Sequence, residues 1–211
     1  MKPSRLLAAG AIAAAIAATP SFADVITDWN KAVMPPAPQL KDVTVDPSTT
    51  ALLILDMMKA NCGRRDLCKA AFPNVKRLHD EARAHNMLIW YSIVGGEKAT
   101  PNDMYDLSIK AKDGEWYRAG GANKFYNSTL DPVLKQAGIK TVIICGTSFQ
   151  GATAGTASEA TQRGYKVIVP VDCSSSEDEF HEAYAAYHLG VGGPVNVTGN
   201  TTLTRSTMIK Y

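Results

Sequence analysis

The sequence has few cysteines, little net charge and no glycine-rich nucleotide motif. Its 211 residues include four cysteines, too few for a disulfide-rich scaffold. Lysine and arginine exceed aspartate and glutamate by only two, so no basic surplus favours binding to nucleic-acid phosphates. Neither the dinucleotide-binding pattern nor the P-loop pattern occurs. What remains is an apolar content of 45%, which is typical of one globular domain.

One long apolar run, at the N-terminus, predicts export. Lys2 and Arg5 precede the apolar residues 6–18, and small residues occupy the −3 and −1 positions of a cleavage site after Ala23. The run is shorter than the roughly 20 residues that span a bilayer. We therefore expect a signal peptide over residues 1–23, with an uncleaved anchor as the alternative. The mature protein is then expected in the periplasm or outside the cell, with no membrane partner.

Export changes the interpretation of Cys62 and Cys68, which bracket a short loop. In an oxidising compartment, a disulfide between them is favoured. A zinc site is the alternative, but it needs two more ligands, and the four histidines show no matching spacing. We expect the disulfide and no metal. Cys145 ends an apolar run and is interpreted as a buried hydrophobic residue.

Apolar runs alternate with helical patterns after a proline-rich arm, residues 24–49. The runs predict strands, and the 3.6-residue patterns predict helices. Strands that are apolar on both faces and separated by helices form a parallel sheet covered on both sides. We therefore expect residues 50–211 to be an α/β domain with three α-β-α layers and a central, mostly parallel, Rossmann-like sheet. The predicted strands are 50–55, 87–94, 141–145, 165–171 and 197–204, and the predicted helices are 74–85, 130–137, 151–163 and 176–189, the last capped by Ser174–Ser176.

Polar residues follow these predicted strands, at the edge where such sheets bind ligands. Asp56 follows the first strand, where partial desolvation tunes a carboxyl group as an acid or base; a helix cap is the alternative. The backbone amides near Gly151 and Thr153 begin a helix and would bind a substrate oxygen, although small residues also suit tight packing. Asp172 and Cys173 follow the fourth strand and are expected at the same cleft.

Two stretches carry a specific resemblance, TALLILDMMKANC and the run from KFYNSTLDPVLKQAG through GTSFQGATAGTASEATQRGYKVIVPVDCSSS. Their order resembles that of the isochorismatase-like hydrolase superfamily over about residues 50–189. The resemblance implies the superfamily's α/β fold and a small-molecule substrate. It also implies catalytic roles for Asp56 and for a lysine near Phe125. Phe125 itself is expected to help to bind substrate.

The departures from the superfamily pattern matter for the chemistry. Amidase branches carry a nucleophilic cysteine four residues before the Thr156-Ala157 pair, where this sequence has Ala152. An alanine cannot form a thioester intermediate. Lys124 is the preferred site cation, and Arg118 is the alternative. Residues 93–103 lack the histidine found in metal-dependent nicotinamidases, so we expect no catalytic metal and no other cofactor.

The sequence thus predicts an exported hydrolase that cleaves a C–O or C–N bond by acid–base catalysis with Asp56 and Lys124. Two alternatives stay open. One is an inactive small-molecule-binding protein on the same fold, and the other is a hydrolase that uses Cys173 as its nucleophile. Aromatic residues at helical spacing near the C-terminus favour a homo-oligomer. No nucleic-acid partner is expected.

Overall fold

The computed structural model describes residues 24–118 and 120–211, so the predicted signal peptide lies outside the described residues. The chain divides into two compact units, with the boundary between Pro36 and Ala37. In the first unit, a short 3-10 turn spans Trp29–Lys31. Before this turn, the backbone N–H groups of Ile26 and Thr27 donate hydrogen bonds to the Asp24 carboxylate. None of the described helices is both long and apolar enough to cross a bilayer.

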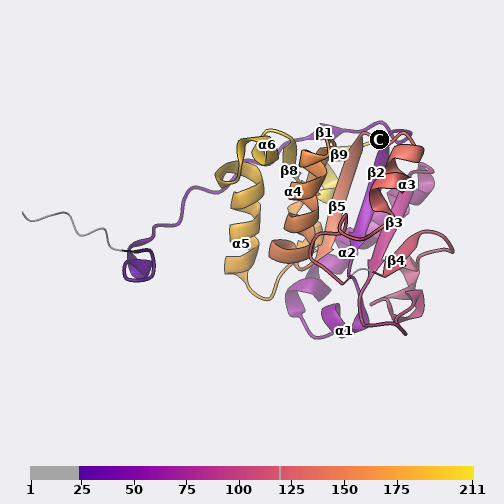
Figure 1. The fold of residues 1–211 in the computed structure, drawn as a ribbon, viewed down its shortest axis with the longest axis horizontal. Helices are drawn as coiled ribbons and strands as arrows, with labels where there is room; N and C mark the ends of the chain where they lie inside the picture. Colours follow the sequence, from indigo (N-terminus) through magenta and orange to yellow (C-terminus); the bar gives the residue numbers. More distant parts are fainter. Residues whose placement is uncertain (1–23, 119) are drawn as a thin grey trace, which may run out of the picture. The chain divides into compact units, whose positions relative to one another are not determined.

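The second unit is built on a parallel sheet, as predicted (Figure 1). Its strands follow the order β4-β3-β2-β5-β6-β8, and the short β7 pairs with the end of β5. A separate pair, β1 and β9, joins the start of the unit to its C-terminus. The strands are β1 (Val43–Thr44), β2 (Thr50–Leu55), β3 (Leu88–Ile93), β4 (Trp116–Arg118), β5 (Thr141–Thr147), β6 (Lys166–Pro170), β7 (Ser174–Ser175), β8 (Thr201–Thr204) and β9 (Ile209–Lys210).

The central strand β2 shows why the apolar runs become strands. All six of its residues are buried. Leu52 and Ile54 face one apolar cluster, whereas Leu53 and Leu55 face the other, as the alternation of side chains along a strand requires. Each fully buried leucine contributes about 2 kcal/mol of hydrophobic stabilisation.

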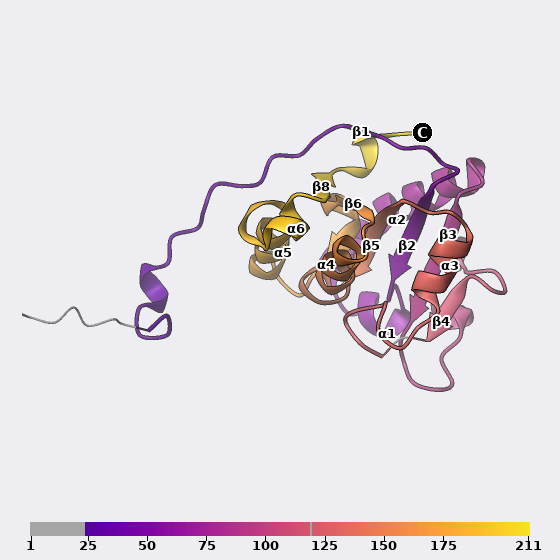
Figure 2. The same ribbon diagram turned by 45° about the horizontal axis from the view of Figure 1, so that its top comes forward.

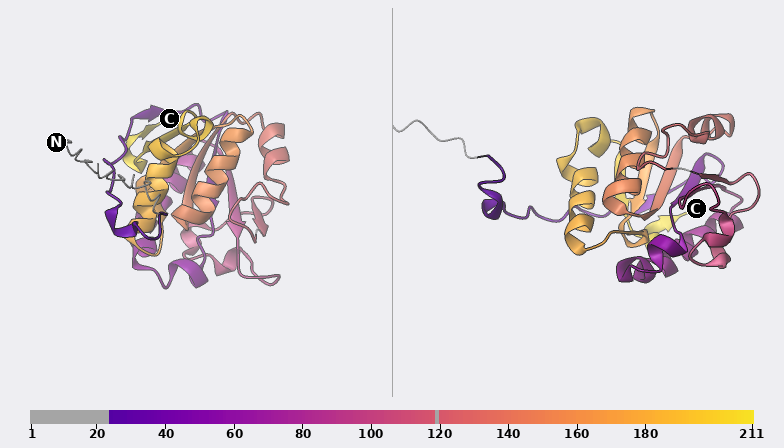
Figure 3. Two further views of the ribbon diagram at one scale, coloured as in Figure 1. Left: turned by 60° about the vertical axis from the view of Figure 1, so that its left-hand side comes forward. Right: turned by 60° about the horizontal axis from the view of Figure 1, so that its bottom comes forward.

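Helices cover both faces of the sheet, which confirms the predicted three-layer architecture (Figures 2 and 3). On one face, the long helix α2 (Asp66–Ala84) packs its buried residues Val75, Leu78 and Ala82 against the first cluster. It follows the short helix α1 (Lys59–Cys62). The other face is covered by α3 (Leu130–Gln136), α4 (Ala154–Gln162), α5 (Glu179–Tyr187) and α6 (Val195–Thr198).

One predicted helix and one predicted strand have different bounds in the structure. Helix α2 begins at Asp66 rather than at residue 74 and continues through Pro73, since its first half is anchored by the buried Cys68. The predicted strand 197–204 is split, because residues 195–198 form α6 between Pro194 and Gly199 and only Thr201–Thr204 pair with β6.

On the second face, α3 begins at Leu130 as predicted, whereas α4 and α5 begin later than predicted. Helix α4 starts at Ala154, after a π-helical turn, η4 (Phe149–Thr153). Helix α5 is capped by Asp178, whose carboxylate accepts a hydrogen bond from the backbone of His181 at 3.0 Å. The predicted serine cap is therefore wrong: Ser174 and Ser175 form β7, and they extend the sheet beside Gly146 and Thr147.

Candidate active site

Asp56 leaves the sheet directly after β2 in a left-handed backbone conformation, with φ of 56°. This conformation is unfavourable for a residue with a Cβ atom, and such residues concentrate at functional sites. The neighbouring strand holds it there, because the Asp56 N–H donates to the carbonyl and hydroxyl oxygens of Ser92 at 3.2 and 3.1 Å. The Ser92 hydroxyl donates in turn to Asp56 Oδ1. The carboxylate is therefore fixed at the carboxyl ends of β2 and β3.

Lys124 pairs with this carboxylate from a distant part of the chain. Its Nζ atom lies 2.7 Å from Asp56 Oδ2 and also donates to the carbonyl of Gly121 at 2.7 Å. Lys124 is only 1% exposed. Burial raises the pKa of Asp56, although the positive charge of Lys124 and the Ser92 hydroxyl act in the opposite direction. A carboxyl group with a raised pKa is suited to donate a proton.

The loop that carries Lys124 is held by small and hydroxyl-bearing residues of α4. The Lys124 N–H donates to Thr156 Oγ1 at 3.1 Å, and the Thr156 hydroxyl donates to the Ala122 carbonyl at 3.3 Å. A Cβ atom added to Gly155 would lie 3.4 Å from the backbone of Ala122. Gly155 therefore allows α4 to pack closely against the loop that carries Lys124.

A cavity of about 220 Å³ opens beside the Asp56–Lys124 pair. Its wall includes the carboxyl ends of β2 and β5, one residue of α1, the residue directly before α2, the loop before Lys124 and the turn η4. Its lining residues are Asp56, Asn61, Arg65, Gly120, Gly121, Ala122, Thr147, Ser148, Gly151 and Ala152. Asp56, Gly151 and Ala152, predicted from two separate stretches of sequence, therefore meet in one cavity.

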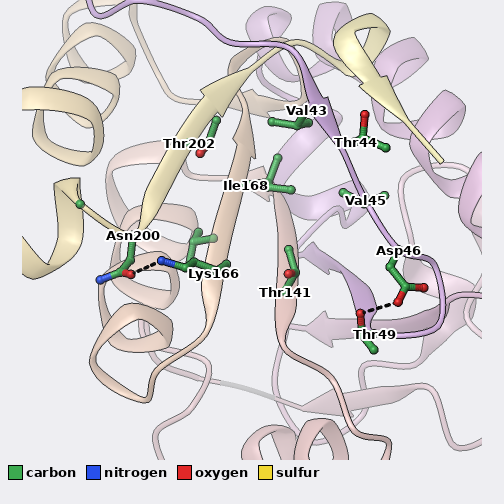
Figure 4. A pocket seen from close by; sticks show the side chains of 12 residues that line it. Val43, Thr44, Val45, Asp46, Thr49, Thr141, Lys166, Ile168, Asn200 and Thr202 are labelled. Carbon is green, nitrogen blue, oxygen red and sulfur yellow. Dashed lines mark hydrogen bonds between the residues drawn. The ribbon is translucent and has the colours of Figure 1, made fainter.

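A larger cavity, of about 520 Å³, lies at the opposite, amino-terminal ends of the strands (Figure 4). Its charged lining residues are Asp46 and Lys166. Both have partners within the protein, since Asp46 accepts from Ser48 and Thr49, and Lys166 donates to Asn200 at 2.8 Å. The Asp56–Lys124 pair is at the other end of the sheet.

The two predicted cations are now distinguished. Arg118, at the end of β4, is exposed; its Nε donates to the Ala99 carbonyl at 3.0 Å and its guanidinium lies over the Trp116 ring at 5.1 Å. Lys124, and not Arg118, forms the ion pair with Asp56, so the predicted alternative of Arg118 as the cation beside Asp56 is wrong. Phe125 and Thr153 are buried and are not among the residues that line the cavity, so their contact with substrate stays a prediction.

Asp172 and Cys173 also lie away from the cavity, contrary to prediction. The chain turns after β6 and packs beneath α2, where Asn74 Nδ2 donates to the Asp172 carbonyl at 3.0 Å. The Asp172 carboxylate accepts two hydrogen bonds from Ser206, each 2.8 Å long. The Cys173 thiol is fully buried in the core beside α2, and burial raises its pKa well above the usual value. The geometry gives Cys173 no access to a substrate in the Asp56 cavity.

Cys62 and Cys68 form the predicted disulfide, with their Cα atoms 5.1 Å apart. It closes the loop between α1 and α2. Within residues 24–118 and 120–211, no group of three or more histidine, cysteine, aspartate or glutamate side chains could hold a metal ion.

Sequence reasoning missed Arg65, Asn61 and Ser148 in the cavity wall. Asn61 Nδ2 donates to the Asp56 carbonyl at 3.1 Å, and Arg65 Nη1 donates to Thr147 Oγ1 at 3.1 Å. Arg65 and its partner on β5 are more than eighty residues apart, so no local sequence pattern predicts their contact. The one signal near Arg65 is the pair of closely spaced cysteines, which predicts a disulfide-closed loop.

A parallel sheet between two helical layers, with a buried carboxylate–ammonium pair at the carboxyl ends of its strands, defines an α/β domain with a small-molecule cavity at its strand ends. Residues 50–195 match the family model of the isochorismatase domain. The chain belongs to the isochorismatase family. It is 32% identical over 168 residues to an uncharacterized isochorismatase family protein of Bacillus subtilis (strain 168), YwoC, covering 68% of this chain and 87% of that protein.

Solved structures share the fold. An isochorismatase family protein from Desulfovibrio vulgaris subsp. vulgaris str. Hildenborough superimposes with a TM-score of 0.65 at 19% identity, over 75% of this chain and 95% of that one. The YcaC gene product of Escherichia coli, described as an octameric hydrolase of unknown specificity, gives a TM-score of 0.64 at 23% identity, over 76% and 77% of the two chains. At these identities, the similarity establishes the architecture alone.

Proposed function

We propose that this protein is an exported hydrolase that cleaves a C–O or C–N bond in a small molecule by acid–base catalysis at Asp56 and Lys124, without a cysteine nucleophile. One observation carries the proposal: Asp56 Oδ2 and Lys124 Nζ lie 2.7 Å apart beside a cavity whose wall at position 152 is an alanine. Family membership supports small-molecule hydrolysis as the general activity.

The chemistry follows from the state of the carboxyl group. In its acid form, Asp56 donates its proton to the substrate, either to the leaving oxygen or nitrogen or to the carbon of a vinyl ether. Water then adds to the resulting electrophilic carbon and returns a proton to the carboxylate. Lys124 stabilises the carboxylate formed after the first transfer. General acid catalysis of this kind accelerates a reaction by roughly 10² to 10⁴.

The cysteine-free route is supported by where the thiols lie. Cys145 and Cys173 are fully buried in the core on the α2 side of the sheet, and burial raises the pKa of both thiols. Neither residue lines the Asp56 cavity. A nucleophilic thiol needs a lowered pKa and access to substrate, so we propose that Ala152 marks a branch of the family that works without one.

A second candidate function is binding without turnover. Asp56, Ser92 and Lys124 satisfy one another by hydrogen bonds and an ion pair, which is also what a purely structural buried pair would show. The two functions differ in what the Asp56 carboxyl does to a bound molecule, and that difference can be measured.

Export and self-association belong to the same proposal. The N-terminal signal pattern and the Cys62–Cys68 disulfide both suit an oxidising compartment. Helix α5 exposes Phe180 and Tyr184 one turn apart, which suits a contact between copies. Fractionation of cells and light scattering of the purified protein test these two points. A cytoplasmic, unprocessed chain would refute export, and a monomer would refute self-association.

The decisive experiment is a hydrolysis screen of amides, ureas and enol ethers with the wild type, Asp56→Asn and the matched control Asp113→Asn, which changes an exposed aspartate. Asparagine keeps an oxygen to accept from Lys124, so the fold should survive. We expect Asp56→Asn to lower kcat at least about 100-fold and Asp113→Asn to leave it unchanged. An unchanged rate in Asp56→Asn would refute the acid role. Binding without turnover by the wild type would favour the second function.

A further inference from the structure

The cavity needs a group that recognises substrate, and Lys124 is not available for this role. Its ammonium already donates to Asp56 Oδ2 and to the Gly121 carbonyl, and its side chain is almost fully buried. A charged substrate must therefore be recognised by another side chain of the cavity wall.

Arg65 is the cation that lines this cavity. Apart from Asp56, it is the one charged residue among the cavity-lining residues in the described part of the chain. Its side chain is 27% exposed, so the guanidinium is accessible from the cavity and still partly desolvated. Nη1 donates to Thr147 Oγ1 at 3.1 Å, which ties the group to the end of β5.

The arginine is also held on a constrained segment. The Cys62–Cys68 disulfide closes the loop on which Arg65 lies, directly before α2. On its outer side, Arg65 Nη2 contacts Glu177 Oε1 at 2.8 Å. The Glu177 side chain is 61% exposed, so this ion pair is weakened by solvent and an anion bound in the cavity can compete with it.

We propose that Arg65 binds the negative group of the substrate and that the substrates of this protein are small organic carboxylates. A guanidinium offers a planar fork of N–H donors that matches the two oxygens of a carboxylate. The proposal rests on the proposed function in one respect, since it takes the Asp56 cavity as the substrate site. In that arrangement, Arg65 holds the carboxylate while the bond to be cleaved lies toward Asp56.

Binding measured without turnover tests this proposal. Ligand-observed NMR titrations of the full protein would compare three carboxylates, acetate, pyruvate and benzoate, with the neutral amides acetamide and benzamide. We expect the wild type to bind at least one carboxylate about tenfold or more tightly than its amide. Arg65→Gln should weaken that binding by roughly 10- to 100-fold and leave amide binding unchanged, with Arg65→Lys intermediate.

Arg64 provides a matched control on the same loop. Its guanidinium is turned away to the Ala60 carbonyl, with contacts of 2.9 and 2.8 Å, and it does not line the cavity. Arg64→Gln removes the same charge, and we expect it to leave carboxylate binding unchanged. Glu177→Gln removes the competing anion and should strengthen carboxylate binding. This variant also keeps the test intact if Arg65→Gln fails to fold.

Three results would overturn the proposal. The first is a folded Arg65→Gln variant that binds carboxylates with the affinity of the wild type. The second is a wild type that binds carboxylates and their amides equally tightly, and the third is a wild type that binds no carboxylate. The two proposals fail separately. If Asp56→Asn keeps full hydrolytic activity while Arg65→Gln loses carboxylate binding, the acid role of Asp56 is wrong and the recognition role of Arg65 stands.

Discussion

A Cβ atom on Gly146 would lie 2.0 Å from the carbonyl oxygen of Leu55, the residue that precedes Asp56. Leu55 and Gly146 are direct partners in the parallel pairing of β2 with β5. Gly146 also has φ of 136°, a conformation that residues with side chains rarely adopt. Strands β2 and β5 therefore approach each other closely at the point where Asp56 leaves the sheet, and only glycine at position 146 permits this close approach.

Gly146→Ala should destabilise the protein by at least about 3 kcal/mol, because it combines a backbone clash with an unfavourable conformation. Urea unfolding measures the loss. Gly164→Ala is the matched control, since Gly164 has φ of 88° but no atom within 4 Å of an added Cβ. We expect it to cost about 1 kcal/mol. Equal losses in the two variants would show that the close approach to Leu55 is unimportant.

The rate of hydrolysis should fall as pH rises. Burial raises the pKa of Asp56, and the proposed mechanism needs its protonated form, so activity is present below that pKa and lost above it. Ser92→Ala removes a donor that stabilises the carboxylate. This variant should raise the pKa of Asp56 further and move the alkaline limb of the kcat profile to higher pH. A profile that rises with pH, or a limb that moves to lower pH in Ser92→Ala, would contradict the acid role.

Ala152→Cys should create an accessible thiol beside the Asp56–Lys124 pair, because position 152 lines the cavity. We expect iodoacetamide to label this variant in its folded state and to leave the folded wild type unlabelled, since Cys145 and Cys173 are buried. Thr153→Cys, one residue along and fully buried, is the matched control and should resist labelling. Labelling of position 153 but not 152 would show that η4 turns its other side to the cavity.

His79 should make the fold sensitive to mild acid. It is buried on α2, and its Nε2 atom has no hydrogen-bond partner among the described residues. Burial lowers its pKa, with Asp80 opposing the shift and Arg83 adding to it. The folded protein therefore binds this proton less readily than the unfolded chain, so stability is full above pH of about 6.5 and lost as pH falls.

His79→Gln should reduce this dependence of the unfolding free energy on pH between pH 7 and 5. One such group contributes a slope of up to about 1.4 kcal/mol per pH unit. Urea unfolding at a series of pH values provides the measurement. If wild type and variant lost stability in parallel, another group would be responsible.

The disulfide has a direct chemical test. Unreduced, denatured protein should show two free thiols, from Cys145 and Cys173. Closing so short a loop stabilises the fold by about 2 kcal/mol in the chain-entropy estimate, so Cys62→Ser should cost about that much. Four free thiols in the unreduced protein would mean that the bond is absent.

Sequence alone determined the framework of the protein. Continuous apolar runs such as β2 can be buried on both faces only inside a covered parallel sheet, and a carboxyl group that follows such a run lies at its carboxyl end. Two closely spaced cysteines, together with the export signal, predicted the disulfide. Each of these predictions depends on residues close together in the chain.

Tertiary structure alone decided which distant side chains meet. The cation beside Asp56 is Lys124 rather than Arg118, because a hydrogen bond to Thr156 holds the loop before α3 in place. The two charged residues of this pair are sixty-eight residues apart in the sequence. Cys173 turns under α2 instead of into the cavity, and Arg65 reaches Thr147 across eighty-two residues. Loop paths set these distances, and they depend on packing between elements, which no periodicity in the sequence records.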